Sequence, residues 1–312
     1  MTVERVPAPH AAPGTRPSVA SVWWRAARPF SLTASLTPVL VGVAAAHHDG
    51  RFDLLRALAT LLGAVAIQIG TNLINDYYDY VRGVDEPGMV GPSGVIHQGL
   101  LPPEAVRRGG FLAFAVGAAL GLWLVAFAGW PILVLGVLSV LAGYAYTGGP
   151  LPLGYVGLGD LVVCLFMGPG IVLGAYYVQT RALGPTPLWA SLPLAALVTA
   201  ILVVNNLRDL ESDRRKGKRT LATLLGRTGT LWEYALLLAA AYATLVGGVV
   251  ARALPPLALA SLLTLPAAWR TWQAVRAVTD PPSLTREGLR GTARLHQRVG
   301  LVLAAALAVT SG

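Results

Sequence analysis

The chain has 312 residues, of which 54% are hydrophobic and only 12% are charged. Apolar runs of about twenty residues, the length that an α-helix needs to cross a bilayer, recur along the sequence. This composition excludes an ordinary soluble domain and indicates a polytopic membrane protein. The net charge of +9 comes from basic residues scattered over the predicted loops. We therefore expect attraction to anionic lipid and to phosphate groups, and no nucleic acid partner.

We expect an all-α fold, a polytopic bundle of nine transmembrane helices. The predicted spans are 30–47, 55–75, 110–129, 131–147, 156–178, 187–206, 231–250, 254–272 and 297–311. Residues 1–20 are rich in Pro and Ala and lack an apolar core, so they predict a disordered cytoplasmic tail and not a signal peptide. No linker divides residues 21–312, which we expect to form one transmembrane domain.

The basic residues predict the orientation of the bundle. With nine spans and a cytoplasmic N-terminus, twenty of the 24 Lys and Arg residues lie on the cytoplasmic side. Only Arg51, Arg56, Arg181 and Arg252 lie on the other side. Because short cytoplasmic loops carry an excess of Lys and Arg, we expect a multi-pass protein of the cytoplasmic (inner) cell membrane.

Seven of the fifteen acidic residues lie in two short windows, 72–86 and 205–218, at the ends of the second and sixth predicted spans. Carboxylates that border a bilayer core are costly unless they are paired or bind something. Within each window, polar residues follow the spacing of one helical face. They are Asn72, Asn75, Asp76 and Asp79 in the first window, and Asn205, Asp209 and Asp213 in the second. Since both spans end on the predicted cytoplasmic side, we expect the two faces to converge.

This convergence of carboxylates and amides suits Mg²⁺, which takes one or two protein carboxylates together with waters and phosphate oxygens. Two ions, each held by one window, would clamp a diphosphate from both sides. Basic residues of the windows would add charge-assisted contacts and neutralise the diphosphate as it leaves. These residues are Arg82, Arg208, Arg214 and Lys218. The alternative is that both windows are ordinary solvated ends of spans.

Two loops on the same side offer weaker candidates. Residues 85–99 contain too many Gly and Pro for a continuous helix, and both a lid over the site and a flexible connection remain open. Its His97 is a weak candidate for an acid or base. Tyr144 and Tyr146 lie where the fourth span turns, and an aromatic face there would stabilise a carbocation. The alternative is the interfacial aromatic belt, which we favour for Trp23, Trp24, Trp232 and Tyr234.

Three motifs carry a resemblance to a known family. The first is Asn75-Asp76-Tyr-Tyr-Asp79, with a further acid at Asp85. The second runs from Asn205 to Leu221, and the third joins 146–150 (Tyr-Thr-Gly-Gly-Pro) to 157–160 (Gly-Leu-Gly-Asp). Over residues 20–310 the chain resembles the UbiA superfamily of intramembrane prenyltransferases, and in particular its menaquinone-pathway branch.

The resemblance implies nine helices around a large apolar cavity that opens sideways to lipid. It implies that Asp76 and Asp79 hold one Mg²⁺, that Asp209 and Asp213 hold a second, and that amides such as Asn72 and Asn205 support them at the binding site of a polyprenyl diphosphate. The implied reaction transfers the polyprenyl group to 1,4-dihydroxy-2-naphthoate with loss of CO₂, which gives demethylmenaquinone. No obligate protein partner is implied.

Two positions depart from the family pattern, and two other functions stay open. Met89 and Leu224 stand where related sequences often carry Arg, so we expect weaker diphosphate binding or a different acceptor. The first alternative is therefore a UbiA-type enzyme that acts on another aromatic or isoprenoid acceptor. The second is a transporter or lipid-binding membrane protein, which would place its acids near the middle of the membrane. Here the acids lie at the ends of spans.

Overall fold

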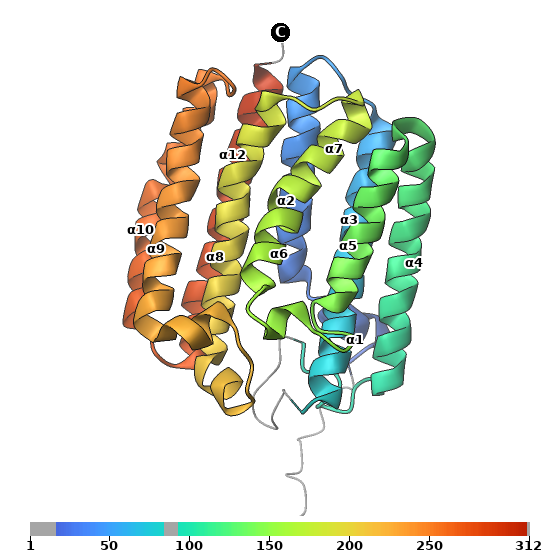
Figure 1. Ribbon diagram of the computed structural model, residues 1–312, viewed down its shortest axis with the longest axis vertical. Coiled ribbons are helices and arrows are strands. Elements are labelled where there is room, and N and C mark those ends of the chain that lie inside the picture. The colour runs from blue at the N-terminus through green and yellow to red at the C-terminus, as the bar shows by residue number, and fades with distance from the viewer. Residues whose placement is uncertain (1–16, 84–92, 311–312) are drawn as a thin grey trace, which may run out of the picture.

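The helices of the protein run side by side along one common axis (Figure 1). The computed structural model describes residues 17–83 and 93–310. These residues are almost entirely helical and contain no β-strand, only an isolated bridge between Val156 and Arg219. The all-α membrane bundle expected from composition is confirmed.

Six helical segments within the described residues are long and apolar enough to cross a membrane, as in an integral membrane protein. They are α2 (Pro29–His48), α3 (Leu54–Val81), α4 (Pro103–Ala128), the α6–η2–α7 segment Gly159–Thr180, α8 (Pro185–Arg215) and α9 (Leu221–Val250). The other three predicted spans coincide with the shorter α5 (Trp130–Ala145), with η3 (Pro256–Thr264) followed by α10 (Leu265–Ala277), and with α12 (Arg290–Val309). The number of nine spans stays a prediction.

Short elements connect the long helices. They are α1 (Val19–Ala26), η1 (Leu153–Tyr155), α11 (Pro281–Ser283) and η4 (Leu284–Leu289). Local sequence also determines where α3 begins and ends. The Asp53 side chain accepts a hydrogen bond of 2.9 Å from the backbone N–H of Arg56, which caps the start. Gly83 follows the end at φ +64°, and Gly217 follows the end of α8 at φ +71°, where glycine carries no steric penalty. Both helices therefore stop just after their acidic windows.

A wide turn interrupts the fifth predicted span. Between α6 (Gly159–Leu165) and α7 (Ile171–Thr180), the segment η2 (Phe166–Gly170) is π-helical around Pro169. Proline lacks the N–H that a regular helix requires, and a π turn accommodates it. Gly168 also packs directly on α8, since a Cβ added there would lie 2.4 Å from that of Ala195. The glycines and the proline thus serve both a bend and a close contact.

The largest apolar core packs α8 against α2, α9 and α12. Tyr234 of α9 is fully buried in this core and bonds the Thr292 hydroxyl of α12 at 2.8 Å. Its assignment to an interfacial belt was therefore wrong, because a helical position two residues from the exposed Trp232 points to the opposite side. On the other side of the bundle, α3 packs on α4 and α5. Between the two halves lies a cavity of about 1550 Å³, lined mostly by apolar side chains.

Candidate active site at one end of the bundle

Both acidic windows reach the same end of the cavity. The lining includes most of the polar residues that the helical spacing singled out, together with two basic residues of the second window. These are Asn72, Asn75 and Asp79 from α3, Asn205, Arg208, Asp209 and Asp213 from α8, and Lys218 just beyond α8. Since α3 and α8 end at the same side of the bundle (Figure 1), the predicted convergence of the two windows is what the structure shows.

Lys218 joins the two windows physically. Its Nζ atom lies 3.3 Å from Oδ1 of Asp213 and 4.4 Å from the ring centroid of Tyr155. The Tyr155 hydroxyl donates a hydrogen bond to Oδ1 of Asp79. Asp79 and Asp213 are both buried, so their charges are costly without such partners. A run of contacts thus connects a carboxylate of α3 to a carboxylate of α8 through one ammonium group and one phenol.

Asp76 is also buried, but it lies behind the cavity wall. Arg28 donates to its Oδ1 atom and the Ser93 hydroxyl donates to its Oδ2 atom. The same Arg28 nitrogen, Nη2, donates to Oδ1 of Asn75 at 3.0 Å. Arg28 precedes α2 in a left-handed conformation (φ +55°), which turns the chain between α1 and α2. Asp76 therefore has to exchange the guanidinium or the hydroxyl for a metal ion if it is to bind one.

Asp209 is the most exposed of the four aspartates, and its carboxylate is held by its neighbour. Arg208 donates from Nε to Oδ1 at 2.7 Å and from Nη2 to Oδ2 at 2.5 Å. Arg208 itself lines the cavity. Each of the four aspartates predicted to bind metal thus contacts a cationic side chain or a phenol in this structure.

Three of the residues predicted to bind substrate do not line the cavity. Arg82 is exposed and donates from Nη2 to the carbonyl of Gly149 at 2.7 Å. The Tyr144 hydroxyl pairs with that of Tyr78 at 2.7 Å. Arg214 is exposed and bonds Glu211 at 3.2 Å. Arg82 and Tyr144 support the wall from behind, and a direct contact of any of the three with substrate needs a side-chain movement.

The loop after α3 is described only from Ser93 onward. Asp85, Glu86 and Met89 lie outside the described residues. The described end of the loop covers Asp76 with Ser93, and its Val95 and Ile96 side chains are buried against α1 and α3. His97 is exposed, with its ring 5.0 Å from that of Tyr80, and it does not line the cavity. Leu224 is 66% exposed and also lies away from the cavity lining.

Tyr146 lines the cavity close to both windows. Its hydroxyl lies beside the start of α6, 3.3 Å from the position that a Cβ on Gly159 would occupy. Burial raises the pKa of Tyr146 well above its ordinary value, and the carboxylates of Asp160, Asp79 and Asp213 raise it further. The side chain is therefore a neutral phenol that presents an aromatic ring to the cavity.

The donor set of the site fits a divalent cation that is shared with a phosphate ligand. The described residues contain no ready-made cluster of three or more His, Cys, Asp or Glu side chains. Mg²⁺ does not require one, because it keeps several waters and is bound by one or two carboxylates plus substrate phosphates. The aspartates and asparagines supply only oxygen ligands and amide groups. Arg and Lys side chains now contact the carboxylates, so a positive charge is electrostatically favourable at this end of the cavity.

Four residues of the site are absent from the sequence-based prediction of contacts. Arg28 and Ser93 come from other parts of the chain, and no local spacing connects them to Asp76. Tyr155 belongs to the third motif, but its hydrogen bond to Asp79 depends on the fold. Gln68 lies four residues before Asn72, so the helical spacing that selected Asn72 extends to it directly.

Comparisons with known proteins agree with this geometry. The model of the UbiA prenyltransferase family matches residues 35–285. The protein named 1,4-dihydroxy-2-naphthoate octaprenyltransferase of Bacillus subtilis (strain 168) is 34% identical over 295 residues, which are 94% of each chain.

Two solved structures of UbiA homologs have a similar fold. The apo structure of a UbiA homolog from Aeropyrum pernix K1 superposes with a TM-score of 0.69 at 18% identity, and covers 89% of this chain and 97% of its own. The structure of a UbiA homolog from Archaeoglobus fulgidus bound to DMAPP and Mg²⁺ superposes with a TM-score of 0.61 at 16% identity, and covers 91% and 99%.

Proposed function

Because the chain belongs to the UbiA prenyltransferase family, we propose that it transfers a polyprenyl group from a polyprenyl diphosphate to 1,4-dihydroxy-2-naphthoate. The observation that carries this proposal is the meeting of two carboxylate windows and Lys218 at the mouth of an apolar cavity of about 1550 Å³. The mouth suits a diphosphate and the cavity suits an isoprenoid chain. The name of the B. subtilis relative supports the acceptor.

Two Mg²⁺ ions are part of the proposal. Asp76 and Asp79 would hold one ion and Asp209 and Asp213 the other. The A. fulgidus homolog bound to DMAPP and Mg²⁺ supports the use of a divalent cation. Bound Mg²⁺ would supply positive charge that stabilises diphosphate as a leaving group.

The chain's own residues position the substrates and exclude water. Lys218 and Arg208 line the cavity and would contact the diphosphate, where each charge-assisted hydrogen bond contributes about 1.5–3 kcal/mol. The amides of Asn72 and Asn75 from α3 and of Asn205 from α8 would provide further polar contacts at the same end of the cavity. Tyr146 presents its ring to the site of the allylic carbon, and an aromatic face stabilises a developing cation.

The bonds of the reaction balance without an oxidant or reductant. The bond between the allylic carbon and the diphosphate oxygen breaks, and the diphosphate leaves with the electron pair. The ring carbon that bears the carboxylate forms a bond with the allylic carbon. The bond from that ring carbon to the carboxylate then breaks, CO₂ leaves, and the electron pair returns to the ring to give demethylmenaquinol.

We place the site on the cytoplasmic face of the cell membrane. Arg25, Arg28 and Lys218 lie at the end of the bundle that carries the site, whereas Arg51 and Arg181 flank the opposite ends of α2 and α7. The positive-inside rule assigns the more basic end to the cytoplasm.

A UbiA-type reaction on a different acceptor is the second candidate. The absence of a cation at Leu224 is the sequence observation behind it, whereas in the structure Leu224 is exposed and lies away from the cavity lining. The transporter alternative lacks support from the fold, because Asp79, Asp209 and Asp213 lie near the ends of α3 and α8 and not at mid-membrane.

The test is turnover by the purified protein in detergent. Geranylgeranyl diphosphate and 1,4-dihydroxy-2-naphthoate are supplied with Mg²⁺ or with a chelator, and products are identified by mass. We expect a prenylated, decarboxylated naphthoquinol that forms only with Mg²⁺. We expect Asp76→Ala and Asp209→Ala to lower kcat by at least about a hundredfold while the protein still inserts and unfolds cooperatively. Near-normal turnover in either variant contradicts the two-ion site, and a product from another acceptor alone supports the second candidate.

A further inference from the structure

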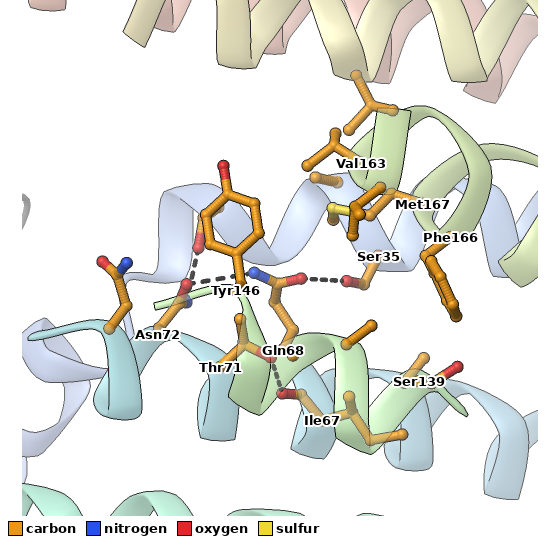
Figure 2. Close-up of a pocket in the computed structure, with 18 of the residues that line it drawn as sticks. Ser35, Ile67, Gln68, Thr71, Asn72, Ser139, Tyr146, Val163, Phe166 and Met167 are labelled. Carbon is orange, nitrogen blue, oxygen red and sulfur yellow. Dashed lines mark hydrogen bonds between the residues drawn. The ribbon is translucent and has the colours of Figure 1, made fainter. Parts of the chain in front are cut away.

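A row of polar side chains continues from the site into the apolar cavity. Figure 2 shows Ser35 of α2 beside Gln68 and Asn72 of α3. The Ser35 hydroxyl donates to Oε1 of Gln68 at 3.0 Å, and Nε2 of Gln68 donates to Oδ1 of Asn72 at 3.2 Å. Asn72 in turn donates from Nδ2 to the carbonyl of Ala27 at 3.0 Å. We call Ser35, Gln68 and Asn72 the polar row.

Gln68 retains unused hydrogen-bonding capacity on the side of the cavity. A glutamine amide offers two N–H donors and two acceptor lone pairs. The two hydrogen bonds to Ser35 and Asn72 use one lone pair and one N–H. Gln68 is only half-buried and lines the cavity, so the second N–H and the second lone pair are available there. A polar group at membrane depth is costly unless a partner satisfies it, which makes a ligand role the first hypothesis for such a residue.

The wall of the cavity that faces away from α3 is apolar. Val163, Phe166 and Met167, from α6 and η2, line the cavity on the side away from α3 (Figure 2). The cavity thus has an apolar wall that suits an isoprenoid chain and a polar row that suits a different ligand. Gln68 lies one helical turn, about 6 Å, deeper than Asn72. A bicyclic ring whose reacting carbon lies near the mouth spans that interval.

We propose that Gln68 binds a hydroxyl group of the aromatic acceptor, on the wall that faces away from the prenyl chain. This inference rests on the proposed function and identifies the acceptor subsite within it. A hydroxyl both accepts from the free N–H and donates to the free lone pair, so it satisfies both groups of one amide. A carboxylate only accepts, and the cationic mouth formed by Arg28, Arg208 and Lys218 suits it better. In 1,4-dihydroxy-2-naphthoate, the hydroxyl remote from the carboxylate is the group assigned to Gln68.

A purely structural role for Gln68 makes a different prediction. The hydrogen bond from Ser35 ties α2 to α3, and such bonds hold membrane helices together. If that tie were the whole role, Ser35→Ala and Gln68→Met would have equal effects on every substrate. Under the proposal, Ser35 positions the amide, whereas Gln68 makes the contact. Gln68→Met keeps the length of the side chain and removes only its polar groups.

The experiment compares two acceptors that differ by one hydroxyl. Purified full-length protein with Mg²⁺ and geranylgeranyl diphosphate is given 1,4-dihydroxy-2-naphthoate or 1-hydroxy-2-naphthoate, and kcat/KM is measured for each. The ratio of the two values is then compared between wild type, Gln68→Met and Ser35→Ala. The intrinsic reactivities of the acceptors cancel in this comparison. We expect the preference for the dihydroxy acceptor to fall about five- to tenfold in Gln68→Met, the effect of one net hydrogen bond, and about twofold or less in Ser35→Ala.

The outcomes separate this inference from the proposed function. Wild-type turnover with an unchanged acceptor ratio in Gln68→Met leaves the proposed function standing and overturns the inference. Equal effects of Gln68→Met and Ser35→Ala on both acceptors assign the row to helix packing and also overturn it. No wild-type turnover of the dihydroxy acceptor rejects both. The KM for geranylgeranyl diphosphate has to stay within about twofold of wild type in Gln68→Met, because the chain lies on the opposite wall. If Gln68→Met does not fold, Gln68→Asn, which shortens the amide beyond reach, gives the same comparison.

Discussion

Lys218 is the residue on which the electrostatic balance of the site depends. It is one ammonium group near two buried carboxylates, bonded to Asp213 and close enough to Asp79 for their charges to interact. Removal of a cation from a buried pair leaves an uncompensated charge, which is strongly destabilising. A divalent cation at the same place would restore the balance. Lys218 and Mg²⁺ are therefore partly interchangeable for folding, but not for diphosphate binding.

We predict that Lys218→Met raises the KM for the prenyl diphosphate about tenfold or more, the loss of one charge-assisted contact. We also predict a lower Tm without Mg²⁺ and a larger rise in Tm when Mg²⁺ is added than in wild type. Thermal unfolding in detergent, with and without Mg²⁺, measures the second effect. Lys216→Met is the matched control, since Lys216 does not line the cavity. An equal Mg²⁺-induced rise in Tm in wild type and Lys218→Met contradicts the interpretation.

Tyr146 could act through its aromatic face or as a proton donor, and two substitutions distinguish these roles. Because burial raises its pKa above the ordinary value of about 10, the phenol keeps its proton throughout the range in which the enzyme is assayed. We predict that Tyr146→Phe keeps kcat within about threefold of wild type with the same alkaline limb, whereas Tyr146→Leu loses about tenfold through the missing cation–π contact. Rates of all three proteins from about pH 6 to about 9.5 provide the measurement. A Phe variant as slow as the Leu variant assigns the chemistry to the hydroxyl.

Helical spacing in the sequence predicts one part of the site and not the other. Asn72 and Asp79 share a face of α3 by periodicity alone, so their common position at the cavity follows from the sequence. Arg28 does not, because its contact with Asp76 joins residues 48 positions apart through the turn between α1 and α2. Arg82 and Arg214 were predicted to reach the diphosphate because they lie next to the carboxylates. In the structure Arg82 is held instead by carbonyls 65 and 67 residues away, which only the fold determines, and Arg214 is held by Glu211 within α8.

At the scale of elements, hydrophobic length predicts the helices better than it predicts their regularity. The long apolar runs of α3, α4 and α8 are plain in the sequence, and their ends follow from local caps and glycines. The apolar run 254–272 looks equally helical, yet its first part is the 3₁₀ segment η3 that packs on α12. Tertiary contacts determine whether such a segment is an α-helix or a 3₁₀-helix, because an apolar run is compatible with both.

Glycines allow the helices to pack closely. The space around each glycine determines whether a Gly→Ala substitution destabilises the protein. A Cβ on Gly42 of α2 would lie 2.3 Å from the backbone oxygen of Val172 in α7, whereas a Cβ on Gly136 of α5 would meet nothing within 4 Å. We predict that Gly42→Ala lowers the free energy of unfolding by about 1–3 kcal/mol through overpacking. Gly136→Ala should not lower the free energy of unfolding, because alanine favours the helix by about 0.8–1.0 kcal/mol relative to glycine.

Thermal unfolding of the two glycine variants in one detergent checks this pair, with the Tm of wild type as reference. Backbone atoms of α7 cannot give way as a side chain can, so the effect of Gly42→Ala should persist when lipid is added. A Tm of Gly42→Ala at or above that of Gly136→Ala would show that α2 and α7 are not packed as closely as the structure has them.

For the whole molecule, the decisive feature is a cavity that no single element predicts. Glycines from α3, α4 and α5, among them Gly63, Gly121 and Gly136, line it together. Each is ordinary in a membrane helix, and only the assembled bundle leaves the volume between them. The sequence therefore indicates the chemistry at the mouth through spaced carboxylates, but it contains no local pattern for the shape behind it.

The length of this cavity matches the membrane. Its lining extends along α3 from Asp79 to Thr60, nineteen residues or about 28 Å of helix, against a hydrocarbon thickness of about 30 Å. A chain that enters at the mouth therefore has room to extend across most of the bilayer inside the protein. Gly121 lies in α4 with open space beside it, on the stretch of the lining that includes Leu124 and Thr60.

We predict that Gly121→Trp blocks the far part of the cavity and discriminates by chain length. Relative to wild type, kcat/KM should stay within about twofold for geranyl diphosphate and fall about tenfold or more for an octaprenyl diphosphate, because the overpacking cost of about 1–3 kcal/mol arises only when a long chain is bound. Competition between the two diphosphates in one reaction, with products separated by mass, measures the ratio directly. Gly121→Ala is the control and should show no discrimination. If Gly121→Trp changes kcat/KM equally for both diphosphates, the long chain does not occupy this part of the cavity and instead leaves between the helices into the lipid.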